Sequence, residues 1–317
     1  MEYRRLGNSG LVVSLLGYGA NNLGRAGTKT EDQAGADAIV GAALDAGITY
    51  FDSADVYGAE YGMSERLLGK ALGSRRDEAV VATKFGMPRS KPGDDIARGS
   101  RAYMLRTLEG SLERLGTDYI DLYYYHSPDE LTPLEETVDA LETAVEQGKV
   151  RYYAISNMAG WQTAATAELA TTGRLVGTQS HYNLIDRRAE LEILPAARHY
   201  GLGVIPYFPL AAGLLTGKYT EGNPGDGRLK EGDPKIEAAD MDQLRAYRDF
   251  CEERGFDQAQ VAIAWLAHQD PVASIIAGAT KPEQIESNAG AAAITLSDDD
   301  LAALDEIFPP AEKVALF

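Results

Sequence analysis

The chain has 317 residues, of which 44% are hydrophobic, so it is long and apolar enough to bury the core of one large barrel or two ordinary domains. Its 30 Lys and Arg against 48 Asp and Glu give a formal net charge of −18, which argues against nucleic acid or an anionic membrane as a partner. The single cysteine, Cys251, excludes an internal disulfide and a thiolate cluster, and we expect no bound metal. Without an apolar stretch long enough for a secretion signal or a membrane span, the sequence predicts a cytoplasmic protein.

The predicted elements begin with a β-hairpin in residues 1–14, where Asn-Ser-Gly supplies a turn between two apolar pieces. A regular alternation of strand and helix follows. The expected strands begin near Leu15, Ile48, Val80, Tyr119, Val150, Val176, Gly203 and Val272. Amphipathic helical patterns lie between them, at residues 31–47, 63–73, 104–116, 134–148 and 283–291.

The spacing of these strands predicts the fold class. Most of them start roughly 25 to 40 residues apart, the length of one strand, one helix and two loops. Strands that alternate with helices form a parallel sheet. Eight such units without an obvious linker favour a closed (β/α)8 barrel, an α/β fold that takes in residues 1–317 as a single domain.

Three stretches interrupt the alternation. Residues 86–100, after the third barrel strand, and residues 209–235, after the seventh, are long loops rich in Gly, Pro and charge. The tail after Leu296 extends past the last barrel helix and is expected to be helical in part. Long loops inside a compact domain are often functional, and the first two leave the end of the barrel where such enzymes carry their chemistry, so we expect them to shape a site.

Four polar residues follow the ends of separate apolar runs. Asp52 and Tyr57 follow ITYF, Lys84 ends VVATK, and His126 ends YIDLYYYH. If the runs are parallel strands, all four side chains converge on one rim. A tyrosine is a poor acid near neutral pH unless a cation stabilises its anion, and Lys84 could be that cation. Asp52 could keep the lysine charged. His126 could hydrogen-bond a carbonyl oxygen. Together they suit proton donation to a carbonyl that receives a hydride.

Each of the four also has an ordinary structural interpretation. A single Tyr or His near a strand end is most often a satisfied core or rim residue, and a Lys beside an Asp is often only an ion pair. The functional interpretation depends on their joint placement after the second, third and fourth strands.

The order and spacing of several motifs then give a resemblance that runs almost the whole length. The motifs are RRLGNSGLVVSLLGYG, FDSADVYG, GMSERLLGKAL, VVATKFG, YIDLYYYHSPD, VRYYAISN, YNLIDRRAE and GATKPEQIESN. In them the chain resembles the aldo-keto reductase superfamily, including its potassium-channel β-subunit-like and sugar- or inositol-linked branches. The resemblance implies a (β/α)8 barrel that reduces carbonyls with a nicotinamide cofactor. It also implies that Asp52, Tyr57, Lys84 and His126 are catalytic, with Tyr57 the general acid for reduction.

The same resemblance implies a cofactor site along the rim. The implied residues are Gly19, Ala20, Asn21, Asp52, Ser156, Asn157, Gln179, Tyr207, Pro209, Leu210, Gly213, Leu215, Gly217, Lys218, Gly278, Ala279, Thr280, Lys281, Gln284 and Asn288. Among them, Ser156, Asn157 and Gln179 correspond to the carboxamide end. Lys218 corresponds to the pyrophosphate and Lys281 to a 2′-phosphate, which favours NADPH and leaves NADH open. Phe208 and His181 depart from the family pattern beside the nicotinamide.

Three functions remain open at this stage. The first is an oxidoreductase that reduces a small aldehyde or ketone with NADPH. The second is a slow-turnover NADP(H)-binding regulatory module, similar to channel β-subunits, with a protein partner. The third is a barrel aldolase in which Lys84 forms a Schiff base, which Asp52 disfavours by keeping the amine protonated. The sequence identifies neither the substrate nor the oligomeric state.

Overall fold

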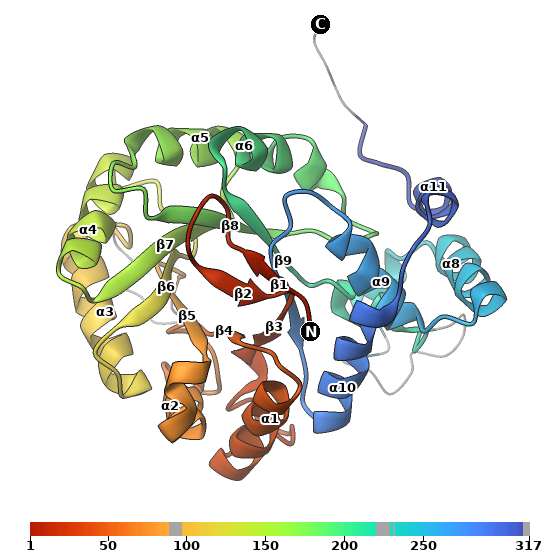
Figure 1. Cartoon of the computed structure of the whole chain (residues 1–317), viewed down its shortest axis with the longest axis horizontal. Coiled ribbons are helices and arrows are strands. Elements are labelled where there is room, and N and C mark those ends of the chain that lie inside the picture. The colour runs from red at the N-terminus through yellow and green to blue at the C-terminus, as the bar shows by residue number, and fades with distance from the viewer. Residues whose placement is uncertain (89–96, 220–228, 231, 313–317) are drawn as a thin grey trace, which may run out of the picture.

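The computed structural model describes residues 1–88, 97–219, 229–230 and 232–312. Eight parallel strands close into a barrel in the order β10-β3-β4-β5-β6-β7-β8-β9 (Figure 1). The strands are β3 (Leu16–Gly19), β4 (Tyr50–Asp52), β5 (Val80–Phe85), β6 (Ile120–Tyr125), β7 (Val150–Ser156), β8 (Leu175–His181), β9 (Gly203–Tyr207) and β10 (Ile275–Gly278). The predicted (β/α)8 barrel is confirmed.

Helices surround the barrel and follow its strands. They are α1 (Gln33–Asp45), α2 (Met63–Leu72), α3 (Arg101–Leu115), α4 (Leu134–Glu146), α5 (Gly160–Leu169), α6 (Ile193–Tyr200), α7 (Pro234–Glu237), α8 (Met241–Arg254), α9 (Gln258–Ala267), α10 (Pro282–Gly290) and α11 (Asp298–Ile307). In the described parts of the chain, no helix combines the length and apolar character that crossing a bilayer requires.

Two predicted boundaries differ from the observed ones for local reasons. Helix α3 begins three residues earlier than the expected 104–116, because the Ser100 side chain accepts a hydrogen bond from the Tyr103 amide and caps the helix there. The last barrel strand begins at Ile275 and not at Val272. Val272 makes only an isolated bridge to Val204, and regular pairing with β3 starts at Ile275.

The predicted hairpin, β1 (Tyr3–Arg5) and β2 (Val12–Ser14), lies across the N-terminal end of the barrel (Figure 1). Its Leu6, Leu11 and Val13 are buried in one cluster with apolar side chains from the barrel interior. Gly203 makes room for this contact, since a Cβ there would lie 2.6 Å from Leu6 Cδ1. The hairpin therefore plugs one end of the barrel, while the strand ends that carry polar residues lie at the other.

The predicted loops and tail are present where the structure describes them. The stretch after β5 includes residues 89–96, and the stretch after β9 includes residues 220–228 and 231, all outside the described residues. The described part of the second stretch contains a 3-10 turn at Ala211–Thr216 and helix α7. The tail forms α11, as expected.

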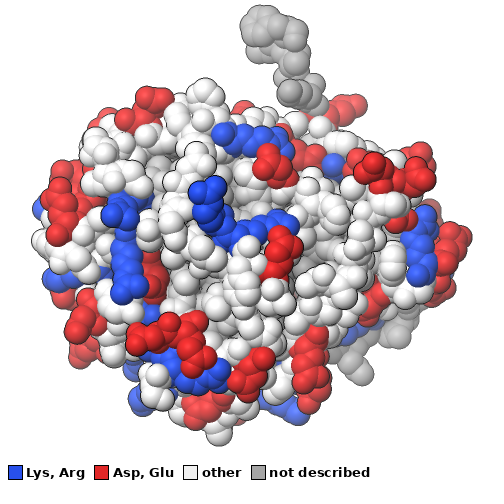
Figure 2. Space-filling view, in the orientation of Figure 1, with Lys and Arg blue, Asp and Glu red and all other residues white. Residues whose placement is uncertain are grey.

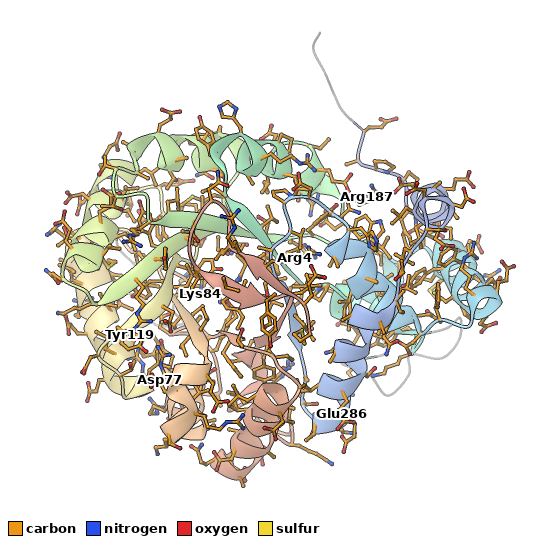
Figure 3. All side chains as sticks on the ribbon, viewed as in Figure 1. Arg4, Asp77, Lys84, Tyr119, Arg187 and Glu286 are labelled. Atoms are coloured by element: carbon orange, nitrogen blue, oxygen red, sulfur yellow. The ribbon has the colours of Figure 1, made fainter. Side chains whose placement is uncertain are left out.

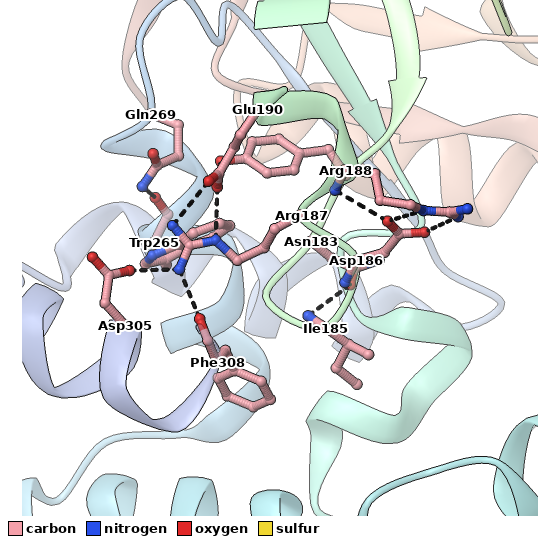
Figure 4. Close-up of polar contacts among 11 residues, drawn as sticks. Asn183, Ile185, Asp186, Arg187, Arg188, Glu190, Trp265, Gln269, Asp305 and Phe308 are labelled. Carbon is pink, nitrogen blue, oxygen red and sulfur yellow. Dashed lines mark hydrogen bonds and ion pairs between the residues drawn. The ribbon is translucent and has the colours of Figure 1, made fainter. Parts of the chain in front are cut away.

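A buried arginine fixes that tail to the barrel (Figure 4). Arg187, in the loop after β8, donates to Glu190 Oε1 at 2.7 Å, to Asp305 Oδ1 of α11 at 2.6 Å and to the Phe308 carbonyl oxygen at 2.7 Å. Its guanidinium carbon lies 5.0 Å from the Trp265 ring centroid. The planar guanidinium thus joins three segments that are far apart in the sequence.

Candidate active site

Strand geometry brings the predicted polar residues together at the C-terminal end of the barrel. Asp52 is the last residue of β4, Lys84 lies near the end of β5, and His126 directly follows β6. Successive side chains of a strand point to opposite faces, so residues two apart share the interior face. Lys84 accordingly lies within the ring of strands (Figure 3).

Asp52 and Lys84 form a buried ion pair. The Lys84 ammonium donates to Asp52 Oδ2 at 2.5 Å and to the Ser53 carbonyl oxygen at 2.7 Å, and the Lys84 side chain has no exposed surface. Burial lowers the pKa of Lys84, and the Asp52 carboxylate opposes that effect. The pair fixes the position of the lysine, as the sequence predicted.

The Tyr57 ring lies next to the Asp52–Lys84 ion pair. The Lys84 nitrogen is 5.0 Å from the Tyr57 ring centroid, and the His126 ring meets the Tyr57 ring edge-on at 5.8 Å and 84°. Although Tyr57 keeps some surface towards the cavity, enclosure by the protein raises its pKa well above the ordinary value, and the Asp52 carboxylate raises it further. Burial is the largest cause of that rise, and the role of Lys84 in stabilising the Tyr57 anion stays a prediction.

His126 is buried and held neutral. Desolvation lowers its pKa well below the ordinary value, and the positive charge of Lys84 adds to the shift. Its Nδ1 is buried without a hydrogen-bond partner among the described residues. A neutral imidazole carries one N–H donor and one acceptor, so His126 can donate a hydrogen bond without carrying charge.

These residues border a cavity of about 830 Å³. Most residues that the resemblance implies for the cofactor line it: Gly19, Asn21, Asp52, Asn157, Gln179, Tyr207, Pro209, Leu210, Gly213, Lys218, Gly278, Ala279, Thr280, Lys281 and Gln284. Tyr57 and His126 line it too. Six predicted site residues are not among those at the cavity surface: Ala20, Lys84, Ser156, Leu215, Gly217 and Asn288. The proposed roles of all these residues remain predictions.

Several predicted cofactor residues already have partners in the protein. Asn157 donates to the His126 carbonyl oxygen at 2.9 Å and accepts from the Tyr207 hydroxyl at 2.7 Å. Gln179 donates to Asp52 Oδ1 at 2.9 Å. The Gln284 Oε1 accepts from the Thr280 amide at 2.8 Å, and from the amide of the N-cap residue Lys281 at 3.2 Å, by which it caps its own helix. These bonds fix the side chains in place before any ligand binds.

The two residues that depart from the family pattern lie around Tyr207. The His181 ring stacks on the Tyr207 ring at 5.4 Å and 10°, and Phe208 meets Tyr207 edge-on at 5.3 Å. His181 Nδ1 is 3.2 Å from Asp186 Oδ2. Phe208 borders the cavity and His181 does not, so His181 supports the tyrosine from outside.

Sequence reasoning missed a group of basic residues in the loop after β3. Arg25 and Lys29 line the cavity together with Lys218 and Lys281, and none of these four forms an ion pair with a described residue. Asp52 is the one carboxylate among the described lining residues, and it is already paired with Lys84. The glycine-rich, basic segment GRAGTK was the signal that could have identified them.

This concentration of positive charge contrasts with the overall charge of the chain. On the face seen in Figure 2, acidic and basic side chains are interspersed. In a chain with a net charge of −18, a cavity with these four cations in its lining is a local exception. Such a cavity suits an anionic ligand, because the ligand would supply the missing counter-charges.

The fold and the site define an oxidoreductase of the (β/α)8 barrel class, and comparison with known proteins gives its family. Residues 15–308 match the model of the aldo/keto reductase family, and the chain belongs to that family. It is 41% identical to the uncharacterized oxidoreductase YrpG of Bacillus subtilis (strain 168), over 98% of this chain and 96% of that protein.

Two other relatives represent different activities. The chain is 38% identical to the L-glyceraldehyde 3-phosphate reductase of Escherichia coli (strain K12), over 96% of this chain and 92% of that protein. It is 39% identical to a probable voltage-gated potassium channel subunit beta of Oryza sativa subsp. japonica, over 91% of this chain and 90% of that protein. Proteins named for the suggested channel β-subunit-like branch are thus among its relatives, together with a reductase of a sugar phosphate.

Proposed function

We propose that this protein reduces an aldehyde or ketone to an alcohol with NADPH, and that Tyr57 supplies the proton. The observation that carries the proposal is the convergence of Tyr57, His126 and the Asp52–Lys84 pair on one cavity. When bound, the reduced nicotinamide supplies two electrons and a hydrogen as a hydride to the carbonyl carbon. The carbonyl oxygen then needs one proton, which the Tyr57 hydroxyl provides.

His126, Lys84 and Tyr57 have separate roles in that proton transfer. Neutral His126 donates a hydrogen bond to the carbonyl oxygen and orients it beside the Tyr57 hydroxyl. Lys84, fixed by Asp52, places a positive charge where the phenolate forms as its proton leaves. Burial keeps Tyr57 protonated at neutral pH, which is the form that a proton donor needs.

The cavity fits a phosphorylated dinucleotide. Four basic side chains offer positive charge to a pyrophosphate and a 2′-phosphate: Arg25, Lys29, Lys218 and Lys281. Lys281, assigned to the 2′-phosphate, supports a preference for NADPH over NADH. Ser156, Asn157 and Gln179 would hold the carboxamide. Tyr207 would stack on the nicotinamide ring, as the family resemblance implies.

Substitution of Tyr57 by phenylalanine tests the proposal. Tyr57→Phe removes the proton and keeps the ring, so carbonyl reduction should fall by about 10²- to 10⁴-fold, the usual contribution of a general acid. NADPH binding, measured by quenching of protein fluorescence, should stay within about twofold of wild type. Reduction at the wild-type rate by this variant would refute the role of Tyr57.

The substrate is to be found with a panel of small carbonyl compounds. NADPH oxidation should be followed with sugars, aldehydes and ketones, and L-glyceraldehyde 3-phosphate belongs in the panel because a relative is named for its reduction. Parallel titrations with NADPH and NADH measure the cofactor preference. Tighter binding of NADH would contradict the assignment of Lys281 to a 2′-phosphate.

A second candidate function is a slow-turnover NADP(H)-binding regulatory module. It is favoured by the similarity to plant proteins named as probable potassium channel β-subunits. Single-turnover and steady-state rates distinguish the two functions. A hydride transfer that is slow even in a single turnover with every carbonyl tested would favour the regulatory module.

A further inference from the structure

A buried amide lies behind the cavity wall formed by β9 and the loop that follows it. Asn183, in the loop after β8, is buried, and both polar atoms of its side chain have defined partners. Its Oδ1 accepts from the backbone amides of Ile185 at 3.0 Å and Asp186 at 2.9 Å (Figure 4). Its Nδ2 donates to the Phe208 carbonyl oxygen at 2.9 Å and lies 3.2 Å from His181 Nε2.

The surrounding backbone fixes which way the Asn183 amide faces. A backbone N–H group can only donate, so the atom that the two backbone amides contact is the amide oxygen. The Phe208 carbonyl oxygen can only accept, so the atom that it contacts is the amide nitrogen. Turning the amide over would set donor against donor on one side and acceptor against acceptor on the other. A buried side chain cannot relieve either conflict with water.

The fixed amide determines which nitrogen of the His181 ring carries a proton. One hydrogen of Asn183 Nδ2 goes to the Phe208 carbonyl oxygen, so the other is left for His181 Nε2. His181 Nε2 must then be the unprotonated nitrogen, because an acceptor is needed there. The proton of the neutral ring lies on Nδ1, which is 3.2 Å from Asp186 Oδ2.

The groups around His181 favour this neutral ring. Burial lowers the pKa of His181, the Asp186 carboxylate raises it, and the positive charges of Arg188 and Lys235 lower it. Arg188 already binds both oxygens of Asp186, at 2.8 Å and 2.5 Å, so that carboxylate has its counter-charge. The Tyr207 hydroxyl adds no charge near neutral pH, since burial raises its pKa.

His181 and Asn183 together support Tyr207 and Phe208, which we call the aromatic wall of the cavity. The His181 ring stacks on the Tyr207 ring at 5.4 Å and 10°. Asn183 holds the Phe208 carbonyl, and Phe208 has a φ of 55°. A residue with a Cβ adopts this left-handed conformation only where its surroundings impose it.

We propose that His181 and Asn183 are positioning residues that hold the aromatic wall in place for the cofactor only while the His181 ring is neutral. This inference rests on the proposed function, because it takes the Tyr207 face as the seat of the nicotinamide. A proton on Nε2 would point at the Asn183 amide group, and two donors would then oppose each other. Because Asn183 cannot turn over, either the ring leaves Tyr207 or the amide leaves the Phe208 carbonyl. Cofactor affinity therefore falls in acid.

The nitrogen resonances of the ring test this inference without any turnover. In protein labelled with ¹⁵N-histidine, the His181 signals are those that His181→Gln removes. At about pH 7.5 they should show a neutral ring with its proton on Nδ1. Saturating NADP⁺ should lower the pKa of that ring, because two coupled binding events affect each other equally. A neutral ring with its proton on Nε2, or a ring that is charged at this pH, would overturn the inference.

The affinity for NADP⁺ at about pH 7.5 and about pH 5.5 gives a second readout, measured by quenching of protein fluorescence. On acidification the Kd should rise about two- to tenfold more in wild type than in His181→Gln, the effect of one lost hydrogen bond. The comparison is needed because the 2′-phosphate of NADP⁺ itself takes up a proton in this range. Glutamine cannot titrate, yet it can accept from Asn183 and donate to Asp186 as the neutral ring does.

His199→Gln is the matched control. His199 is an exposed histidine of α6 that does not line the cavity, so its removal should leave the acid response of the wild type intact. An equal response in wild type and His181→Gln, or a response that His199→Gln also removes, would overturn the inference. A wild type that binds no NADP⁺ at either pH would fail the proposed function and this inference together, whereas binding that does not depend on His181 fails the inference alone.

Discussion

Two clusters of charge, each built around a buried cation, use the same interactions for different purposes. In one, Lys84 and Asp52 meet inside the barrel; in the other, Arg187 meets Glu190 and Asp305 beneath the C-terminal helix (Figures 3 and 4). Both join a long cationic side chain to carboxylates at short distance. A buried ion pair by itself therefore does not mark an active site.

The surroundings distinguish the two clusters. Arg187 is enclosed by its carboxylates, a backbone oxygen and the Trp265 ring, so its bonding capacity is used within the protein. Next to Lys84 lie a protonated phenol that borders the cavity and a neutral histidine with an unpartnered ring nitrogen. A charged group beside unsatisfied, titratable neighbours and an open cavity is the arrangement that chemistry requires.

The largest expected difference between the clusters is in the reaction rate. Lys84→Met removes the cation beside the departing proton, and we expect carbonyl reduction to fall by about 10²- to 10⁴-fold. Single-turnover measurement with saturating NADPH separates this loss from a change in cofactor binding. Arg187→Met is the control, since it removes a buried, paired cation that does not line the cavity, and its rate should stay within about threefold of wild type. Equal losses in both variants would mean that Lys84 acts only through stability.

The second expected difference is in stability. Arg187→Met leaves Glu190 and Asp305 without their shared partner and releases the tail; because both carboxylates reach solvent, the free energy of unfolding should fall by about 1 to 2 kcal/mol. Urea denaturation measures this change, and limited proteolysis should cut first near α11. An unchanged unfolding free energy would show that the tail is held by its apolar contacts alone.

The sequence predicted the barrel well because its signals are local. Alternating apolar runs, glycine C-caps and the Asn-Ser-Gly turn each act within a few residues, and the hairpin and all eight strands are present, with the last strand starting three residues later than expected. Parallel strands of a barrel end at one rim, so the sequence could also predict that four polar side chains converge there: Asp52, Tyr57, Lys84 and His126.

Contacts between strands could not be predicted in the same way. The bond between Gln179 and Asp52 joins residues 127 positions apart, and the choice of that partner depends on side-chain orientation inside the closed barrel. The pKa of Tyr57 could not be predicted from the sequence for a related reason. A sequence shows that a lysine is near a tyrosine, but the balance between its charge and the desolvation of the phenol is set by how tightly the two are enclosed.

The smallest expected difference between the clusters lies in the pH dependence of stability. His126 beside Lys84 has a lowered pKa, whereas unfolded histidine titrates near about 6.5. As pH falls through that value, the unfolded state takes up a proton that the folded state does not, so acid favours unfolding. The unfolding free energy of the wild type should therefore decrease between about pH 7 and pH 5, with a maximal slope of about 1.4 kcal/mol per pH unit from this one group.

Two variants assign that slope to the active-site cluster. His126→Gln removes the titrating ring and should flatten the decrease, while Arg187→Met, which removes a group that stays charged throughout this range, should lower the stability at every pH and keep the slope. Urea denaturation at several pH values measures both. A slope that is the same in His126→Gln and in wild type would mean that the His126 ring takes up its proton over the same pH range in the folded protein as in the unfolded chain, which would contradict its lowered pKa.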